Sequence, residues 1–368
     1  MTTIINGSSP SITFSDGSAQ TSATRPFQNR IINGGMTISQ RNGTSAVTID
    51  GGASYTLDRY LCQDNTDGSF SVQQSSTAPT GFNNSMLVTI TGTDSSLTTT
   101  QFGRIVQRIE GFNTADLGWG TASASTVTLS FWVRSSVTGT FSGTLVNNDS
   151  NRIYAFTYTI NAANTFEYKT ITIAGDTTGT WATNNSTGIE LNLSIGAGPD
   201  RSVAAGSWGT SLAYAATGQT NLFATSSATF YITGVQLEVG STATSFDYRP
   251  YGTELALCQR YFYKVIGGSG TGGYNSIGNG SVSGSTGGDI FCPIPVTMRA
   301  TPSCSFTGSI YVYDGSAALT LISITTVYGG FSNIYMSVVS SSGLTIGRGM
   351  MVYTNNNSAN TFSFSAEL

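Results

Sequence analysis

The chain has 368 residues, of which 39% are hydrophobic, 11% aromatic and 9% charged, and its net charge is −4. This length suits two domains, and so much apolar surface excludes a disordered chain. Because histidine is absent and no run of Lys and Arg occurs, the sequence also excludes Ser-His-Asp and Cys-His nucleophile systems and argues against a nucleic-acid partner.

The sequence carries no sign of a membrane span or a metal-rich framework. No apolar run reaches the roughly 20 residues that a membrane helix needs, and residues 1–10 lack the basic start and apolar centre of a secretion signal. We therefore expect no membrane insertion and a protein made in a cytoplasm. The cysteines have no C-x-x-C spacing, so we expect reduced, buried thiols rather than a zinc site or disulfides. They are Cys62, Cys258, Cys292 and Cys304.

Residues 1–28 contain few apolar side chains and several turn formers, so they are not expected to fold alone. One interpretation is an extended attachment arm that docks on a neighbouring subunit by adding main-chain hydrogen bonds at a sheet edge. The other is a frayed terminus. The residues expected to attach the arm are Ile12, Phe14, Asp16 and Gly17.

Residues 29–250 are expected to form a jelly-roll β-sandwich. Gly, Ser, Thr and Asn dominate the composition, which favours short strands joined by tight turns and so an all-β chain. A jelly roll buries many one-sided strands while limiting exposed sheet edges. The main strands are expected at 55–62, 69–73, 86–91, 102–109, 127–134, 140–146, 152–160, 166–174, 189–195 and 228–239.

The clearest strand is 127–134, with the sequence VTLSFWVR. Successive side chains of a strand point to opposite faces, so Phe131 belongs to the apolar face and Trp132 and Arg134 to the other. We therefore expect Phe131 in the core and Trp132 on the face that points away from it.

The stretch from 229 to 264 joins two domains. The apolar alternation changes parity at Gly234, which indicates a glycine bulge in a half-buried strand. The following Arg249-Pro250 sequence cannot continue a central strand and marks a domain boundary. After it, residues 254–264 are compatible with either one short helix or a new aromatic strand.

Residues 251–368 are expected to form a smaller C-terminal antiparallel β-sandwich. The tract 267–288 is so rich in Gly and Ser that it reads as a loop or a pair of flexible strands. The strands that follow are expected at 289–298, 302–306, 309–313, 319–326, 333–339, 349–354 and 361–364.

The chain offers little catalytic chemistry. A glycosidase would need two carboxylates across a cleft, and no pair stands in a recognisable setting, so we expect no enzyme. The scattered candidates are Glu110, Asp116, Glu167, Asp176, Glu190, Asp200, Glu238 and Asp247. No cofactor or metal ligand set is predicted. A structural calcium ion is kept as an alternative, although the spacing of Asp64, Asp67, Asp149 and Asp176 resembles no calcium loop.

Glycan binding is a function that the aromatic residues could support. Flat aromatic faces cover the C–H surfaces of sugars, and neighbouring polar groups pair with their hydroxyls. The alternative is that each tryptophan fills the core or a subunit interface. The candidate glycan-binding residues are Trp119, Trp132, Arg134, Trp181 and Trp208.

Four passages carry a resemblance to structural proteins of tailed bacteriophages, especially fibre-like and adhesin-like ones. The longest is GVQLEVGSTATSFDYRPYGTELALCQRYFYK at 234–264. The others are ITFSDGSAQTSA at 12–23, NRIINGGMTISQRNG at 29–43 followed by YTLDRY at 55–60, and PIPVTMRATPS at 293–303.

This resemblance implies a virion protein with a jelly roll like that of carbohydrate-binding modules. The resulting hypothesis is a non-enzymatic, tail-fibre-like adhesin subunit, assembled in the host cytoplasm, forming a homo-oligomer, with a trimer favoured. Its partners would be other virion proteins through the arm and host-surface polysaccharide as receptor. The alternatives are a capsid fibre or head decoration protein and a glycan-degrading tailspike.

Overall fold

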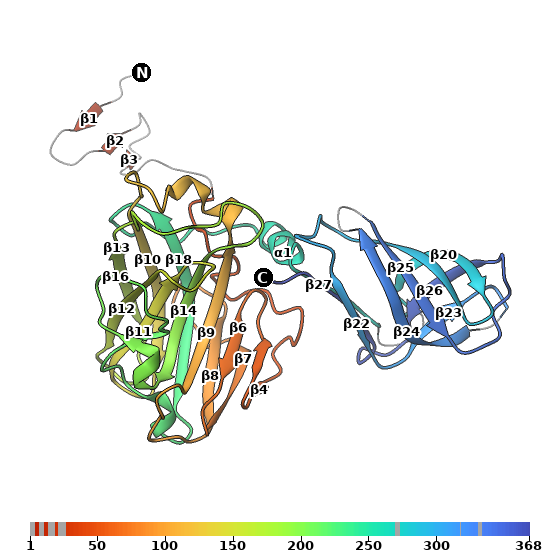
Figure 1. Cartoon of the computed structure of the whole chain (residues 1–368), viewed down its shortest axis with the longest axis horizontal. Coiled ribbons are helices and arrows are strands. Elements are labelled where there is room, and N and C mark those ends of the chain that lie inside the picture. Colours follow the sequence, from red (N-terminus) through yellow and green to blue (C-terminus); the bar gives the residue numbers. More distant parts are fainter. Residues whose placement is uncertain are drawn as a thin grey trace.

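The computed structural model describes residues 27–268, 273–316, 318–329 and 333–368, and the backbone of three short strands before them. The described residues form two β-domains with one α-helix, α1 (Tyr251–Gln259), between them (Figure 1). The predicted all-β class is confirmed. In the described part of the chain, no helix is long and apolar enough to cross a membrane.

The three short strands belong to the expected attachment arm. They are β1 (Ile4–Asn6), β2 (Ser11–Thr13) and β3 (Ala19–Gln20), and they pair as an antiparallel meander. Ile12 pairs with Ile5 on one side and Gln20 on the other, so the backbone doubles back instead of running as one extended segment. Phe14, Asp16 and Gly17 lie outside the described residues.

The first domain is a sandwich of two antiparallel sheets. Sheet I has the order β13-β10-β18-β8-β7-β4 and sheet II the order β16-β12-β11-β14-β9-β6-β5. The strands of sheet I are β4 (Val47–Ile49), β7 (Ser69–Ser75), β8 (Ser85–Gly92), β10 (Val127–Ser135), β13 (Glu167–Ile173) and β18 (Thr229–Val239). Those of sheet II are β5 (Ala53–Tyr55), β6 (Leu61–Asp64), β9 (Phe102–Glu110), β11 (Gly139–Val146), β12 (Ile153–Ile160), β14 (Thr187–Ala197) and β16 (Trp208–Gly209).

Short elements fill the connections of this sandwich. A parallel pair of two-residue strands, β15 (Ser202–Val203) and β17 (Ala215–Ala216), lies in the loop that follows β14. Four 3₁₀ turns occupy Gly111–Asn113, Ala115–Leu117, Pro199–Arg201 and Leu222–Ala224.

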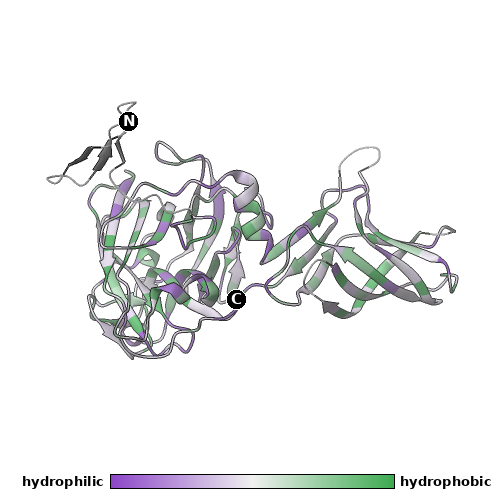
Figure 2. Ribbon diagram, turned by 90° about the horizontal axis from the view of Figure 1, so that it is seen from above, coloured by the Kyte–Doolittle hydropathy of each residue, from purple (hydrophilic) through white to green (hydrophobic). Residues whose placement is uncertain are grey.

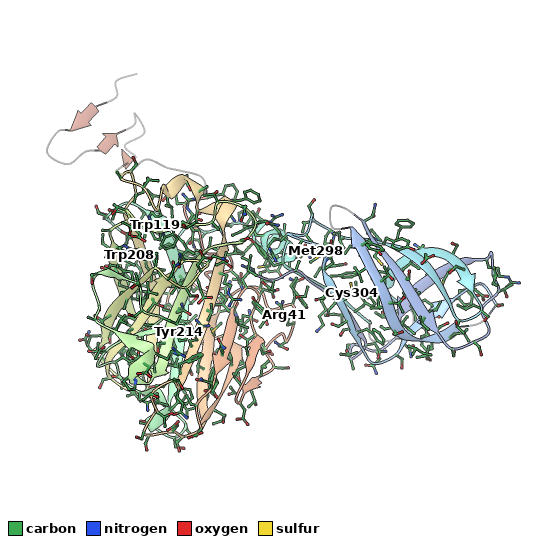
Figure 3. All side chains as sticks on the ribbon, in the orientation of Figure 1. Arg41, Trp119, Trp208, Tyr214, Met298 and Cys304 are labelled. Carbon is green, nitrogen blue, oxygen red and sulfur yellow. The ribbon has the colours of Figure 1, made fainter. Side chains whose placement is uncertain are left out.

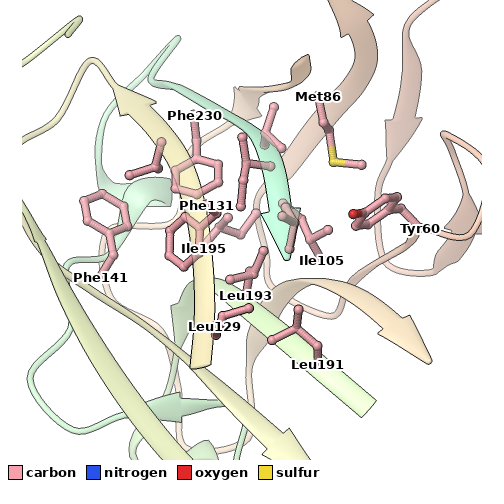
Figure 4. Close-up of a cluster of buried hydrophobic side chains, with 14 of the residues drawn as sticks. Tyr60, Met86, Ile105, Leu129, Phe131, Phe141, Leu191, Leu193, Ile195 and Phe230 are labelled. Atoms are coloured by element: carbon pink, nitrogen blue, oxygen red, sulfur yellow. The ribbon is translucent and has the colours of Figure 1, made fainter. Parts of the chain in front are cut away.

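The core of the sandwich follows the predicted strand parity. Phe131 is fully buried, and Figure 4 shows it among aromatic and aliphatic side chains of both sheets, such as Phe141 and Leu193. Trp132, its neighbour in β10, is only half-buried and points to the outer face of sheet I, as predicted. Each fully buried apolar side chain of this kind contributes about 1.5–3 kcal/mol to the free energy of unfolding.

The predicted glycine bulge lies in β18. The register between β10 and β18 passes from Ser130 opposite Gln236 to Trp132 opposite Thr233, so Gly234 and its successor share one partner. Gly234 has a φ of +62°, which only glycine adopts without strain. The bulge changes which side chains face the core, and this accounts for the change of parity in the sequence.

The C-terminal domain differs from the expected sandwich. Six strands close into a barrel in the order β20-β21-β25-β24-β23-β26, and β19-β27-β22 form a separate small sheet. Closure pairs every strand edge, which an open sandwich of short strands leaves exposed. The strands are β19 (Phe262–Ile266), β20 (Ser276–Gly284), β21 (Gly287–Pro293), β22 (Ser303–Thr307), β23 (Ile310–Tyr313), β24 (Ala318–Gly329), β25 (Asn333–Ser340), β26 (Gly349–Thr354) and β27 (Thr361–Ser365). Figure 2 shows apolar residues alternating with polar ones along the strands of both domains.

The stretch 254–264 contains both of the elements that the sequence left open. Helix α1 ends at Gln259, and the aromatic strand β19 begins at Phe262. The helix packs against the first domain, because Cys258 and Tyr261 form a buried cluster with Ile32 and Ile38. The predicted boundary at residue 250 lies before α1, although this helix packs on the first domain. The core of the second domain begins only after the helix, with Tyr263 and Val265 of β19.

Buried ion pairs hold the joint between the domains. Glu110 of β9 accepts hydrogen bonds from Arg260 at 2.7 and 3.0 Å and from the Tyr261 hydroxyl at 2.8 Å. Near the last residue of the chain, Glu367 pairs with both Arg41 and the buried Arg59 of the first domain. We call these six residues the joint cluster. Because the first domain, the chain just after α1 and the C-terminal end of the chain meet there, the cluster fixes α1 and the returning chain on the sandwich.

All four cysteines are free thiols, as predicted. Cys62, Cys258 and Cys292 are buried, and Cys304 is half-buried. Burial raises the pKa of the Cys62 thiol to about 12, with a small opposing effect from the Thr56 hydroxyl, so it remains an unreactive thiol at neutral pH.

Candidate functional site

Three of the predicted tryptophans meet in one tryptophan cluster, formed by Trp119, Trp181 and Trp208. Their ring centroids lie 4.7 to 5.5 Å apart, in edge-to-face contact. Figure 3 places Trp119 and Trp208 together at one end of the sandwich. Trp208 lies in the short strand β16 rather than in a loop, opposite Tyr154 of β12.

The polar edges of the tryptophan cluster are already used within the protein. The Trp119 indole donates to the Ser125 carbonyl at 2.8 Å, and the Trp208 indole donates to the Ala174 carbonyl at 2.8 Å. The Trp181 indole donates to Asp176, whose carboxylate also receives two hydrogen bonds from Arg152. The cavity beside Trp119 and Trp181 measures only about 20 Å³. This geometry indicates that the three rings pack against the end of the hydrophobic core and leave no open ring face large enough to stack a sugar.

Trp132 and Arg134 lie elsewhere, on the outer face of sheet I. Across β13, β10 and β18, Tyr168 pairs with Trp132, and Arg134 pairs with Tyr231. The rings of Trp132 and Tyr168 are 5.3 Å apart, and the Arg134 guanidinium lies 4.9 Å from the centre of the Tyr231 ring. We call Trp132, Tyr168, Arg134, Tyr231 and Phe166 the aromatic row. The structure thus divides the five predicted glycan-binding residues between two places.

A third aromatic site, absent from the sequence predictions, lies on the outside of the C-terminal barrel. It is a hollow of about 640 Å³, which we call the tyrosine hollow. Pockets that hold small ligands measure about 300–1,000 Å³. Its lining comes from β20, β23, β24, β26 and the loops beside them, and consists of Tyr274, Ser276, Tyr311, Tyr313, Ala318, Met351, Tyr353 and Asn355.

Strand alternation explains why these side chains face outward. In β23, Ile310 and Val312 are fully buried inside the barrel, so Tyr311 and Tyr313 between and after them point to its outer surface. Tyr353 is opposite Tyr311 in the neighbouring strand, and their ring centroids are 5.9 Å apart. The rings of Tyr274 and Tyr353 are also in edge-to-face contact, with centroids 5.7 Å apart. The result is a contiguous wall of rings.

The tyrosine hollow combines ring faces with hydrogen-bonding groups. Burial raises the pKa of the Tyr353 hydroxyl, and the nearby hydroxyls of Tyr274, Tyr311 and Tyr313 raise it further. It therefore stays protonated at neutral pH and can donate a hydrogen bond. With the Ser276 hydroxyl and the Asn355 amide in the lining, the site offers the pairing of flat rings and small polar groups that suits a sugar.

The sequence carries a local signal for the outward-facing side chains of this hollow. The segment IYVY at 310–313 alternates aliphatic and tyrosine residues, and in MVY at 351–353 of the adjacent strand Val352 separates Met351 from Tyr353. What the sequence alone could not supply is the pairing of β23 with β26, which lie far apart along the chain.

The acidic residues considered for catalysis are mostly held by structural partners. Glu190 of β14 pairs with Arg104 and Arg108 at 2.8 Å, and these contacts lower its pKa although burial alone would raise it. Glu238 accepts from Thr244 and Gln236, and the carboxylates Glu110, Asp116, Glu167, Asp176 and Asp247 are likewise engaged. Among the described residues, no group of three or more Cys, Asp or Glu side chains could hold a metal ion.

Comparison with known proteins finds no family model and no curated protein that matches the sequence. Among solved structures, the enzymatically active domain of tailspike protein 4 from bacteriophage CBA120 is similar over 59% of this chain and 22% of its own length, with 12% identity and a TM-score of 0.31. The matched part of this chain therefore spans about a fifth of the length of that solved chain.

Two carbohydrate-binding modules are also similar. TmCBM61, solved with β-1,4-galactotriose, matches 59% of this chain and 100% of its own at 10% identity and a TM-score of 0.28. The family 11 module from Clostridium thermocellum, solved with a mixed-linked tetrasaccharide, matches 55% and 100% at 14% identity and a TM-score of 0.27. At such low identities and TM-scores, these likenesses carry no argument about what this chain binds.

Proposed function

We propose that this protein is a non-enzymatic, carbohydrate-binding structural protein that binds surface glycans through its C-terminal barrel. The observation that carries the proposal is the tyrosine hollow, which is of ligand size and is walled by four tyrosine rings with Ser276 and Asn355 beside them. Aromatic rings that are already held by their neighbours lose little freedom on binding, so a sugar ring can stack on them at low entropic cost.

The proposal also assigns a biological setting. The resemblance of four passages to tailed-phage fibre and adhesin proteins supports a virion component, attached through residues 1–28 and assembled as a homotrimer. In that arrangement the first domain supports the barrel, and the joint cluster holds the barrel at a fixed angle for contact with a bacterial surface.

Glycan-array binding of the labelled full chain, combined with a reducing-end assay on every glycan that binds, tests the biochemical part. We expect binding without release of new reducing ends. Release of reducing ends would instead make the protein a glycan-degrading enzyme. No binding and no release would reduce it to a purely structural role.

Electron microscopy of intact virions, with an antibody against the C-terminal domain, tests the setting. We expect the label at the tail. Label spread over the head would replace the adhesin by a capsid fibre or decoration protein, and unlabelled virions would contradict a virion role.

A further inference from the structure

The aromatic row on the outer face of sheet I presents Arg134, which has no hydrogen-bond or ion-pair partner among the described residues. The guanidinium of Arg134 lies over the rings of Tyr231 at 4.9 Å and Phe166 at 5.9 Å. Its Nε is buried and has no hydrogen-bond partner, and no carboxylate of the described residues pairs with it. Among the described residues, the Arg134 guanidinium is therefore positioned by the two rings, and its N–H groups remain available to a ligand.

A second polar group beside the row is also unused. Thr233 is fully buried, and its hydroxyl has no hydrogen-bond partner. It is the cross-strand neighbour of Trp132, so it lies on the same face of the sheet as the row.

The rings lie next to one another across the strands, with their planes inclined by 45° between Trp132 and Tyr168 and by 70° between Phe166 and Tyr231. Trp132 and Tyr168 lie side by side in one cross-strand line, and Tyr231 and Phe166 flank Arg134 in the next. Tyr168 is 43% exposed, so its face is open to solvent. A row of this kind suits successive residues of a polysaccharide, since each sugar offers a C–H face for stacking.

We propose that the aromatic row is a second binding site, distinct from the tyrosine hollow, for an anionic polysaccharide whose carboxylate or sulfate pairs with Arg134. The planar guanidinium matches such oxyanions with two parallel hydrogen bonds, and desolvation by the rings strengthens the interaction. This inference rests on the proposed carbohydrate-binding function and adds the charge class of a second ligand.

Binding of the full chain to polygalacturonic acid, to its carboxyl-reduced form and to a sulfated galactan, measured at two salt concentrations, tests the inference. We expect binding to one or both of the charged polymers, none to the reduced form, and weaker binding at high salt. Arg134→Met should weaken the binding about 10-fold or more. Arg348→Met removes one exposed arginine outside the row and should leave the binding unchanged. Preference between carboxylate and sulfate identifies the source of the charge.

Several results would overturn the inference. Equal binding by wild type and Arg134→Met would remove Arg134 from the site. If the protein binds only neutral glycans and Tyr353→Ala abolishes this binding, the aromatic row is not a binding site for an anionic polysaccharide. The proposed function of the tyrosine hollow would still hold. A change of oligomeric mass in Trp132→Ala, without a change in polysaccharide affinity, would make the row a contact between copies of the chain. If no charged or neutral glycan binds at all, the proposed function fails as well.

Discussion

At the scale of single residues, Phe131 and Trp132 lie on opposite faces of β10, so truncating them should lower the free energy of unfolding by different amounts. Phe131→Ala should lower the free energy of unfolding by about 3–5 kcal/mol, because it leaves a cavity in a packed core. Trp132→Ala should lower it by clearly less, since its ring is half-buried on the outer face. Chemical denaturation of both variants measures the difference. Equal losses would show that Trp132 is a core residue.

The carboxylate of Glu167 makes a pH-dependent contribution to stability. Burial alone would raise its pKa, but hydrogen bonds from Lys169, Ala162 and Asn161 outweigh it and lower the pKa from 4.5 to about 2. A group whose pKa is lowered by folding stabilises the protein above its unfolded pKa and loses that effect as the pH falls through the folded value.

We therefore expect wild type to be more stable than Glu167→Gln by a constant amount above about pH 5, with the difference shrinking between pH 4.5 and about 2. Denaturation curves of both proteins over this range measure it. A difference that does not depend on pH would contradict the assigned contacts.

At the scale of elements, the bulge in β18 depends on glycine for two reasons. Gly234 has a positive φ, and a Cβ at this position would come within 2.6 Å of the Phe82 ring. Gly234→Ala should therefore cost about 1–2 kcal/mol for the backbone and a further 1–3 kcal/mol for the overlap. Gly218→Ala is the matched control, because Gly218 also has a positive φ but has open space around it. Equal destabilisation of the two variants in urea would refute the role of Phe82.

Elements with a strong local pattern could be predicted, and elements that depend on distant pairing could not. The parity of β10 and the bulge at Gly234 followed from alternation alone. The eleven residues 254–264 mix helix formers with aromatic residues, so the sequence left open whether they form a helix or a strand; they contain the end of α1 and the start of β19. Closure of the C-terminal strands into a barrel depends on β20 pairing with β26, which no local pattern specifies.

The same distinction applies to the candidate sites. The aromatic character of Trp119, Trp181 and Trp208 indicated that each could stack on a sugar. The fold instead brings their rings together and pairs their indole N–H groups with acceptors inside the protein. Trp132 and Arg134 were placed correctly on one outer face because strand parity decides it. The tyrosine hollow was missed because its walls come from strands that meet only in the folded barrel.

At the scale of the whole molecule, the joint cluster should couple the two domains. Glu367 is the common partner of Arg41 and the fully buried Arg59, so Glu367→Gln leaves a buried guanidinium without its counter-charge. We expect a loss of about 3–5 kcal/mol and separate thermal transitions for the two domains. Asp116→Asn, which breaks the exposed pair with Arg30, should cost about 1 kcal/mol or less. A single, unshifted calorimetric transition in Glu367→Gln would contradict the coupling.

The most direct test of the account is calorimetric titration of an oligosaccharide selected on the glycan array into three forms of the full chain. These are wild type, Tyr311→Ala/Tyr353→Ala, which removes two walls of the tyrosine hollow, and Tyr328→Ala, which removes an exposed tyrosine outside its lining. We expect wild type and Tyr328→Ala to bind equally and the double variant, still folded, to lose about 10-fold or more in affinity, since stacking on each ring is worth about 1 kcal/mol. Undiminished binding by the folded double variant would show that the protein does not bind carbohydrate through its barrel.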